Sequence, residues 1–170
     1  MSDLALHHNG MSSCSLKVRL VLAEKELAFT SHEVNLVTGE QHAADYVKLN
    51  PHHVVPPLVH DGRGLIESSL INEYLDETFP AVPMQPTTPA ARHAMRLWVK
   101  QIDEKVHPAA AVLTYAIGGR PAMLAQPPEV RAAALAGIPD PARRAARASV
   151  LEHGVAAPEF AGALGAFLDL

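Results

Sequence analysis

Hydrophobic positions in the first half of the chain alternate between strand-like and helix-like spacing. The apolar stretch Leu4–Leu6 precedes Leu16–Lys25, which is rich in good helix formers and predicts a helix that begins near Ser13 and ends by Leu27. Ala28–Leu36 then alternates loosely, as a second strand does. Strand, helix and strand in this order predict a right-handed parallel crossover.

A second set of elements follows. A short helix is expected from Ala43 to Leu49, stopped by Asn50-Pro51. Val54–Glu67 is predicted to be an antiparallel hairpin around Asp61-Gly62. Ser68 or Ser69 is available to cap a third helix, which Pro80 ends. The residues expected on its packed face are Leu70, Ile71, Tyr74, Leu75 and Phe79.

Prolines between this helix and the next predict a linker. We assign residues 1–80 to a first α/β domain of thioredoxin-like order (βαβ-α-ββα), 81–87 to the linker and 88–170 to an all-α domain. Thr88-Pro89 is a helix start signal, and Pro108 predicts a bend before closure at Gly118-Gly119. The apolar stripe of this helix is Met95, Trp98, Ile102, Val106, Ala109 and Leu113. Later helices are expected at Glu129–Ala136, Pro141–His153 and Pro158–Leu168.

Composition narrows the possible classes of protein. With 170 residues, 48% of them hydrophobic, the chain can bury a real core. A formal net charge of -4 argues against a nucleic-acid partner. The single cysteine excludes an internal disulfide, and the start of the chain predicts neither a signal peptide nor a membrane span, so a cytoplasmic location is expected. The ten histidines lack metal-ligand spacing, which predicts no metal site.

The stretch with the most chemical character is Ser12-Ser13-Cys14-Ser15. It lies where the first helix begins, beside unpaired backbone N–H groups and the positive end of the helix dipole. Thiolates are stabilised in such a place. The alternatives are that Ser12 and Ser15 are simple caps and that Cys14 is a small buried hydrophobe.

These residues resemble the glutathione transferases. The order βαβ, short helix, Asn50-Pro51, Val55-Pro56-Pro57-Leu58, hairpin and Glu67-Ser68 is similar to their thioredoxin-like domain. Within the family, Ser12-Ser13-Cys14-Ser15 followed by Lys17-Val18-Arg19 resembles the zeta class, which includes maleylacetoacetate isomerase and tetrachlorohydroquinone dehalogenase. The resemblance covers residues 4–118.

The resemblance implies roles for single residues. Ser12 would donate its hydroxyl to the glutathione sulfur, and Cys14 would take part in thiol–disulfide exchange. A cis bond at Val55-Pro56 would turn the Val55 backbone toward the peptide. A plain trans proline at a strand start is the alternative.

The same resemblance implies contacts for the two ends of glutathione. Glu67 and Ser68 would hold the γ-glutamyl end, for which a solvated Glu and a plain cap are the alternative. Gln41, His42 and Lys48 are placed near the glycine carboxylate, although each is also typical of a surface residue. Ser13 is assigned to the same binding site.

Two departures from the family pattern lead to further expectations. Val54 stands where the family often has Gln, and His52-His53 replaces small residues, which predicts the loss of one polar contact to the tripeptide. The chain also stops before the family's helix with a buried Ser/Thr and Asp motif, so the helical domain is expected to be incomplete.

The leading functional hypothesis is a glutathione S-transferase that uses glutathione as co-substrate. Its thiolate would attack a small electrophile that is aromatic, halogenated or unsaturated. Glutathione-dependent isomerisation, reductive dehalogenation and ether cleavage begin with the same attack and stay open. A homodimer without nucleic-acid or membrane partners is expected. The alternative of another class is a non-catalytic binding or assembly module on the same fold.

Overall fold

A four-stranded mixed sheet organises the first of two units in the computed structural model, which describes residues 3–169. The first unit contains the chain up to Leu36 and Glu40–Met95, and the second contains Val37–Gly39 and Arg96–Leu170. The elements of the first unit are β1 (Leu4–His8), α1 (Ser13–Glu24), β2 (Thr30–Glu33), η1 (Glu40–His42), α2 (Ala44–Leu49), β3 (Leu58–His60), β4 (Arg63–Leu65) and α3 (Ser68–Thr78).

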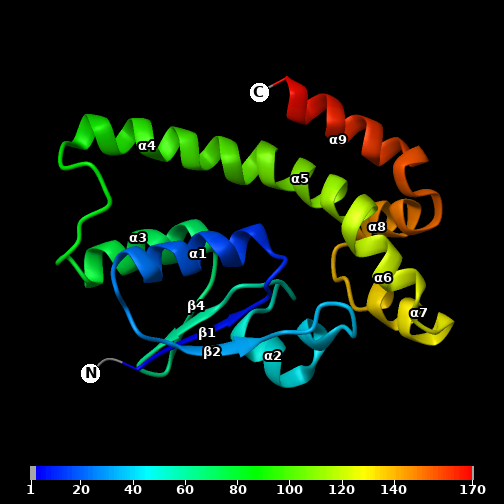
Figure 1. Ribbon diagram of the computed structural model, residues 1–170, viewed down its shortest axis with the longest axis horizontal. Helices are drawn as coiled ribbons and strands as arrows, with labels where there is room; N and C mark the ends of the chain where they lie inside the picture. The colour runs from blue at the N-terminus through cyan, green and yellow to red at the C-terminus, as the bar shows by residue number, and fades with distance from the viewer. Residues whose placement is uncertain (1–2, 170) are drawn as a thin grey trace. The chain divides into compact units, whose positions relative to one another are not determined.

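The sheet has the order β2-β1-β3-β4, with β1 parallel to β2 and antiparallel to β3. The predicted parallel arrangement of the first two strands is therefore confirmed. Figure 1 shows α1 and α3 together on one face of this sheet and α2 on the other. The thioredoxin-like order predicted for the first half of the chain is present.

Alternation along β1 decides which side chains enter each layer. Leu4 and Leu6 are buried with Val18, Leu22 and Ile71 of α1 and α3. Side chains at odd positions of β1 point to the opposite face, because successive strand residues alternate. A second, smaller cluster of Val34, Tyr46 and Val55 gathers around α2.

The predicted hairpin is present but shorter than expected. β3 and β4 are antiparallel, and the turn between them has positive φ at both Asp61 (48°) and Gly62 (79°), the conformation that favours an Asp-Gly pair. Residues 54–57 are not part of β3, because the cis bond Val55–Pro56 interrupts the strand there.

The start of α3 differs from the prediction. Glu67, with φ 68° and ψ 101°, occupies the cap position, and Ser68 is the first helical residue, so neither Ser68 nor Ser69 is the cap. Leu70 is also wrong as a packed residue, since it is 62% exposed. Ile71 and Leu75 carry the buried face.

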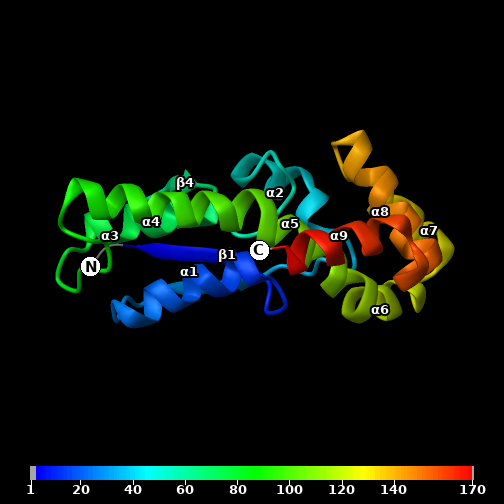
Figure 2. The ribbon, with the colours of Figure 1, turned by 90° about the horizontal axis from the view of Figure 1, so that it is seen from above.

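The remaining elements are helical. They are α4 (Pro89–Gln101), η2 (Ile102–Val106), α5 (His107–Thr114), η3 (Tyr115–Gly119), α6 (Arg120–Leu124), α7 (Pro128–Ala136), α8 (Pro141–His153), η4 (Gly154–Ala156) and α9 (Pro158–Leu168). The start of α4 is as predicted, because the Thr88 hydroxyl accepts the N–H of Ala91 at 3.2 Å. Figure 2 shows α9 lying alongside α5, where the two helices are in contact.

Two wide turns interrupt this helical run, each just before a proline. η2 and η3 are π-helical, with i→i−5 bonds from His107 to Ile102 and from Arg120 to Tyr115. Pro108 and Pro121 lack a backbone N–H, and a wider turn removes the clash of their rings with the preceding carbonyl groups. The predicted closure at Gly118-Gly119 is wrong, because the helix passes through both glycines.

The apolar stripe predicted for this helix is only partly buried. Ala109 is 6% exposed, whereas Trp98 is 68% and Ile102 43% exposed, so the prediction is wrong for these two side chains. The core of the second unit gathers instead around Ala116, Val150 and Ala157.

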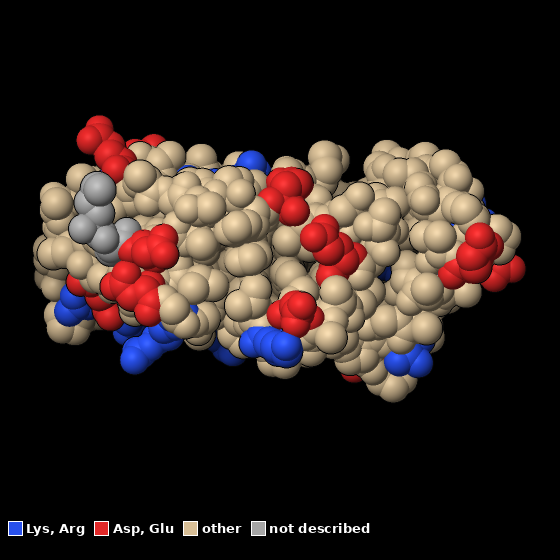
Figure 3. Space-filling model, turned by 90° about the horizontal axis from the view of Figure 1, so that it is seen from below, with Lys and Arg blue, Asp and Glu red and all other residues tan. Residues whose placement is uncertain are grey.

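Charged side chains on the face drawn in Figure 3 lie in small groups between uncharged residues. The basic groups form no continuous patch on this face of residues 3–169. Within those same residues, no helix combines the length and apolar character that a membrane crossing requires.

A buried ion pair joins the end of α1 to the last turns of α3. Lys25 Nζ lies 2.5 Å from Asp76 Oδ1, with both side chains less than a tenth exposed. Lys25 also donates to the carbonyls of Phe79 (3.0 Å) and Val82 (2.6 Å). The Asp76 carboxylate accepts the N–H groups of Met84 and Gln85. The pair therefore shapes the whole segment that leaves α3.

The protonation of Asp76 follows from these contacts. Burial alone would raise the pKa of the Asp76 carboxyl, but hydrogen bonds from Lys25 and two backbone N–H groups, with the lysine charge, hold that pKa below its ordinary value. The carboxylate is thus stabilised in its charged form.

Replacing Asp76 tests this anchor. Asp76→Asn is expected to lower the free energy of unfolding by about 3 kcal/mol, because the buried lysine loses its counter-charge. The deficit should be full above the ordinary carboxyl pKa of about 4 and should vanish as pH falls through the lower pKa of folded Asp76. Urea denaturation followed by circular dichroism at several pH values measures both effects.

Asp45→Asn is the matched control. Asp45 pairs with Lys48 at 2.7 Å, but its side chain is 94% exposed, so a loss of at most about 1 kcal/mol is expected. Equal losses in the two variants would contradict the anchoring role of Asp76.

Candidate functional site

The turn between β1 and α1 places Ser12 at the cap of α1. Its backbone is extended (φ -81°, ψ 119°), and its Oγ accepts the N–H of Ser15 at 3.2 Å. The Ser12 O–H donates to no group among residues 3–169. Because Oγ already accepts a helix N–H, its own hydrogen becomes a better donor toward an incoming acceptor.

Ser13 and Cys14 begin α1 beside this hydroxyl. Ser13 is exposed and Cys14 is half-buried, so both lie in the first turn, where backbone N–H groups favour negative charge. Ser15 is fully buried and therefore belongs to the frame of the turn.

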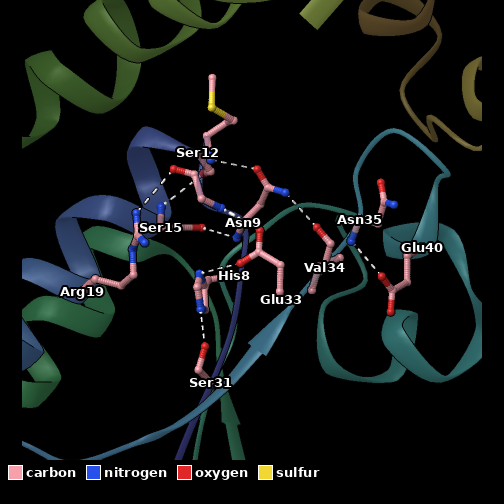
Figure 4. Close-up of polar contacts among 12 residues, drawn as sticks. His8, Asn9, Ser12, Ser15, Arg19, Ser31, Glu33, Val34, Asn35 and Glu40 are labelled. Atoms are coloured by element: carbon pink, nitrogen blue, oxygen red, sulfur yellow. Dashed lines mark hydrogen bonds and ion pairs between the residues drawn. The ribbon is translucent and has the colours of Figure 1, made fainter. Parts of the chain in front are cut away.

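Asn9 is the residue that links this turn to its surroundings. Its Nδ2 donates to the carbonyl of Val34 at 2.9 Å, and its Oδ1 accepts the N–H of Met11 at 3.0 Å. Figure 4 shows Asn9 between the start of α1 and the segment after β2. Sequence analysis did not single out this residue, although Asn9-Gly10 is a turn signal.

A second group of contacts lies on the other side of the turn. Glu33 Oε1 accepts the N–H of Gly10 at 2.9 Å, and its Oε2 lies 3.4 Å from His8 Nδ1. Burial lowers the pKa of the His8 imidazole, while the Glu33 charge acts in the opposite direction. His8 Nε2 lies 2.7 Å from Ser31 Oγ.

The bond between Val55 and Pro56 is cis, as predicted. Val55 is buried, yet its backbone N–H and C=O have no hydrogen-bond partner among residues 3–169. Buried backbone groups are rarely left unpaired, so these two groups are available to pair with the backbone of a ligand. The carbonyl before it, that of Val54, accepts from Tyr46 Oη (2.7 Å) and Asn50 Nδ2 (2.8 Å).

Tyr46 is a donor that sequence analysis missed. Burial raises the pKa of its hydroxyl, and the charge of Glu40 adds to this effect, so the phenol stays protonated. It therefore fixes Val54, and with it the neighbouring Val55, on α2.

Glu67 and Ser68 lie at the start of α3. Glu67 is exposed and keeps a positive φ of 68°, and Ser68 is buried. The cap position supplies no side-chain hydrogen bond, so the first N–H groups of α3 are left for another acceptor. Lys17 of α1 donates to Ser69 Oγ at 2.6 Å, which brings the starts of both helices to one side of the unit.

Gln41 and His42 form η1 and reach the cis-proline segment through His53. Gln41 Nε2 lies 3.0 Å from His42 Nε2, and His42 Nδ1 lies 3.0 Å from His53 Nδ1. Lys48 is exposed and pairs with Asp45 instead. Within residues 3–169 no group of three or more His, Cys, Asp or Glu side chains could hold a metal ion.

The predicted residues thus occupy neighbouring segments of the first unit. The N–H of His7, at the end of β1, donates to the carbonyl of Pro57 at 3.0 Å, which sets the Ser12 turn beside the cis-proline segment. Their assignment to glutathione remains a prediction.

Most of these residues lie in a stretch of the chain that matches a known family model. Residues 11–78 match the model of the glutathione S-transferase N-terminal domain. This stretch of the chain is similar to a glutathione S-transferase N-terminal domain. The match includes Ser12, Val55 and Ser68, and it begins after Asn9.

The proteins that are similar to the chain include the three that follow. Protein LigF of Sphingobium sp. is 40% identical over 59% of this chain and 40% of its own length. The crystal structure of LigF, described as a beta-etherase, superposes with a TM-score of 0.85 over 96% of this chain and 68% of that one, at 28% identity.

The second relative is the probable maleylacetoacetate isomerase of Vibrio cholerae, 36% identical over 64% of this chain and 51% of its length. The third is a theta-class glutathione S-transferase of Xanthomonas axonopodis pv. citri, solved with glutathione bound. It has a TM-score of 0.65 and 28% identity over 80% of this chain and 65% of that one. The chain spans about half or less of the length of the curated relatives named here.

The buried frame of the Ser12 turn leads to a stability prediction. Ser15→Ala is expected to lower the free energy of unfolding by about 1–3 kcal/mol, because the N–H of Asn9 loses its acceptor, Ser15 Oγ at 3.3 Å. Ser13→Ala, an exposed change in the same turn, should stay within about 0.5 kcal/mol of the parent. Urea denaturation measures both, and an unchanged Ser15→Ala would show that the buried hydroxyl does not support the turn.

Proposed function

We propose that this chain binds glutathione through its glutathione S-transferase domain and activates the thiol for attack on a small electrophile. The observation that carries the proposal is that two groups without partners among residues 3–169 lie in neighbouring segments. One is the Ser12 hydroxyl, which is free to donate, and the other is the backbone N–H and C=O of Val55. A cysteinyl residue held by Val55 as an added strand would bring its sulfur toward the start of α1.

Each part of the tripeptide has a partner of suitable chemistry. The γ-glutamyl carboxylate suits the open N–H groups at the start of α3 with Ser68, and the ammonium suits Glu67. The glycine carboxylate is assigned to Gln41 and His42. These assignments are supported by the family match to residues 11–78 and by the glutathione-bound theta-class relative.

The chemistry at Ser12 follows from charge. Donation from Ser12 Oγ and the dipole of α1 lower the free energy of the thiolate relative to the thiol, so more glutathione is nucleophilic at neutral pH. The sulfur then forms a bond to the electrophilic carbon, and the leaving group departs with the bonding pair. A proton from solvent neutralises the leaving group.

Ether cleavage is the reaction of this kind that the comparisons favour. Support comes from the LigF beta-etherase structure, whose TM-score of 0.85 covers nearly all of this chain. In such a reaction the thiolate attacks the ether carbon and an alkoxide or phenolate leaves. A cytoplasmic homodimer completes the proposal.

Retention on immobilised glutathione, followed by ultraviolet absorbance of the bound thiolate, tests the proposal. We expect both retention and a thiolate signal at neutral pH. Absence of both retention and a thiolate signal would refute the proposed enzymatic activity and favour a non-catalytic module on this fold.

Separate variants of Ser12 and Cys14 distinguish activation from exchange. Ser12→Ala should reduce kcat by about a hundredfold on an aryl ether and on a conjugation substrate, because the thiolate loses a donor. Cys14→Ala should leave both rates near the parent. With a halogenated quinol, Cys14→Ala should stop turnover after the first adduct, because Cys14 attacks the adduct sulfur, forms a disulfide with glutathione and releases the reduced ring.

The outcomes of these assays are separable. An unchanged ether-cleavage rate in Ser12→Ala would refute thiol activation by this hydroxyl. An unchanged dehalogenation rate in Cys14→Ala would refute the exchange step alone.

Removing the Tyr46 hydroxyl tests the backbone contact at Val55. Tyr46→Phe should weaken glutathione binding severalfold, because Val54 and Val55 lose part of their support. Tyr74→Phe is the matched control, since Tyr74 Oη bonds His60 Nδ1 at 2.7 Å in another part of the unit. Both variants should lose about 1 kcal/mol of free energy of unfolding. A difference between their affinities for glutathione, measured by calorimetry, would therefore come from the Val54 segment and not from lost stability. Equal affinities would contradict the backbone contact.

A further inference from the structure

Three hydrogen bonds close a ring at the turn before α1. The N–H of Ser12 donates to the carbonyl of Asn9 (3.1 Å), the N–H of Asn9 to Ser15 Oγ (3.3 Å), and the N–H of Ser15 to Ser12 Oγ (3.2 Å). Each of the three residues donates one of these hydrogen bonds and accepts another. A change in the position of Ser12 Oγ would therefore break the ring. Figure 4 shows the three residues facing one another.

The side chain of Asn9 fastens this ring to the rest of the domain. Its amide donates to the Val34 carbonyl and accepts the N–H of Met11, so all four polar groups of Asn9 are used. Only an amide of this length supplies a donor and an acceptor at once. Alanine has neither, and aspartate has no donor for a carbonyl.

Val34 links the ring to the cis-proline segment. It is 2% exposed and packs in the same cluster as Val55, and its N–H donates to the carbonyl of His8 at 2.7 Å. Asn9 therefore holds one end of a short path that runs from Ser12 through Val34 to Val55. These are the two groups assigned above to the sulfur and to the backbone of one cysteinyl residue.

We propose that Asn9 is a positioning residue that sets the Ser12 hydroxyl relative to the Val55 backbone, so that the sulfur of bound glutathione meets the donor. The inference rests on the proposed function of the same site. Asn9 touches neither reactant and acts only through Ser12. A misplacement of about 1 Å at a reacting group is enough to reduce a rate by up to about a hundredfold.

A merely structural role for Asn9 makes a different prediction. General loosening of the domain would weaken every glutathione ligand and leave the ionisation of the bound thiol unchanged. If Asn9 positions Ser12, replacing Asn9 raises the pKa of the bound thiol and leaves the affinity for ligands without a thiol unchanged. S-methylglutathione is such a ligand, because its sulfur cannot ionise.

The experiment compares Asn9→Ala with the parent protein and with Asn35→Ala. Asn35 is an exposed asparagine next to Val34 in sequence, and its backbone N–H and C=O both bond to Glu40. In Asn9→Ala the pKa of bound glutathione, read from thiolate absorbance against pH, should rise by about one unit, and kcat should fall about tenfold. Affinity for S-methylglutathione should be unchanged, and Asn35→Ala should match the parent throughout.

Ser15→Ala is the substitute variant for this test if Asn9→Ala does not fold. It opens the same ring while keeping the Asn9 amide, and the pKa of the bound thiol should rise in the same direction. An unchanged thiol pKa in either folded variant, or equal losses of affinity for glutathione and S-methylglutathione, would overturn the inference. Failure of the parent itself to bind glutathione would instead overturn the proposed function.

Discussion

The ring formed by Asn9, Ser12 and Ser15 is the constraint on which the candidate site depends. A helix that starts near a surface leaves its first N–H groups without partners, and a serine cap satisfies one of them. In this chain the cap hydroxyl can have a second use, because accepting from Ser15 leaves its own hydrogen available for donation. Structural capping and the proposed thiol activation therefore involve one atom, Ser12 Oγ.

Other contacts in the domain hold the Ser12 turn in place. β1 pairs with β3 and thereby sets the Ser12 turn next to the cis-proline segment, while Tyr46 and Asn50 hold that segment from α2. On the far side, the buried pair of Lys25 and Asp76 fixes the exit from α3. A site built from two helix starts and an unpaired backbone requires that none of these supports move.

Local signals were sufficient for much of the fold. Pro141 and Pro158 stand in the first turns of α8 and α9, and both helices have the predicted bounds because proline is favoured there. The Asp61-Gly62 turn was also readable from a short motif. In these cases neighbouring residues determine the conformation, whereas the cis bond at Val55-Pro56 was expected only from the family resemblance.

The predictions were wrong or incomplete where contacts between residues far apart in the sequence determine the local conformation. Ser68 was predicted as a cap because it is a good cap residue, but Glu67 takes that position with a positive φ, a conformation that local preference disfavours. Gly118-Gly119 resembles a stop, yet the π-turn before Pro121 lets the helix continue. Asn9 escaped notice because its importance lies in a contact with Val34, 25 residues further on.

Ser12 and Cys14, the two residues at the start of α1 that are assigned to sulfur chemistry, would be needed for different reactions. In the proposed function Ser12 would act on the incoming thiol, which every reaction beginning with thiolate attack requires, so its geometry cannot distinguish conjugation from ether cleavage. Cys14 becomes necessary only when the sulfur must be removed again from the product carbon, because a second thiol has to accept it. Under the proposed function the residues gathered around the Ser12 turn would therefore define the nucleophile, and the choice of reaction would depend on the leaving group and on whether Cys14 reaches the adduct.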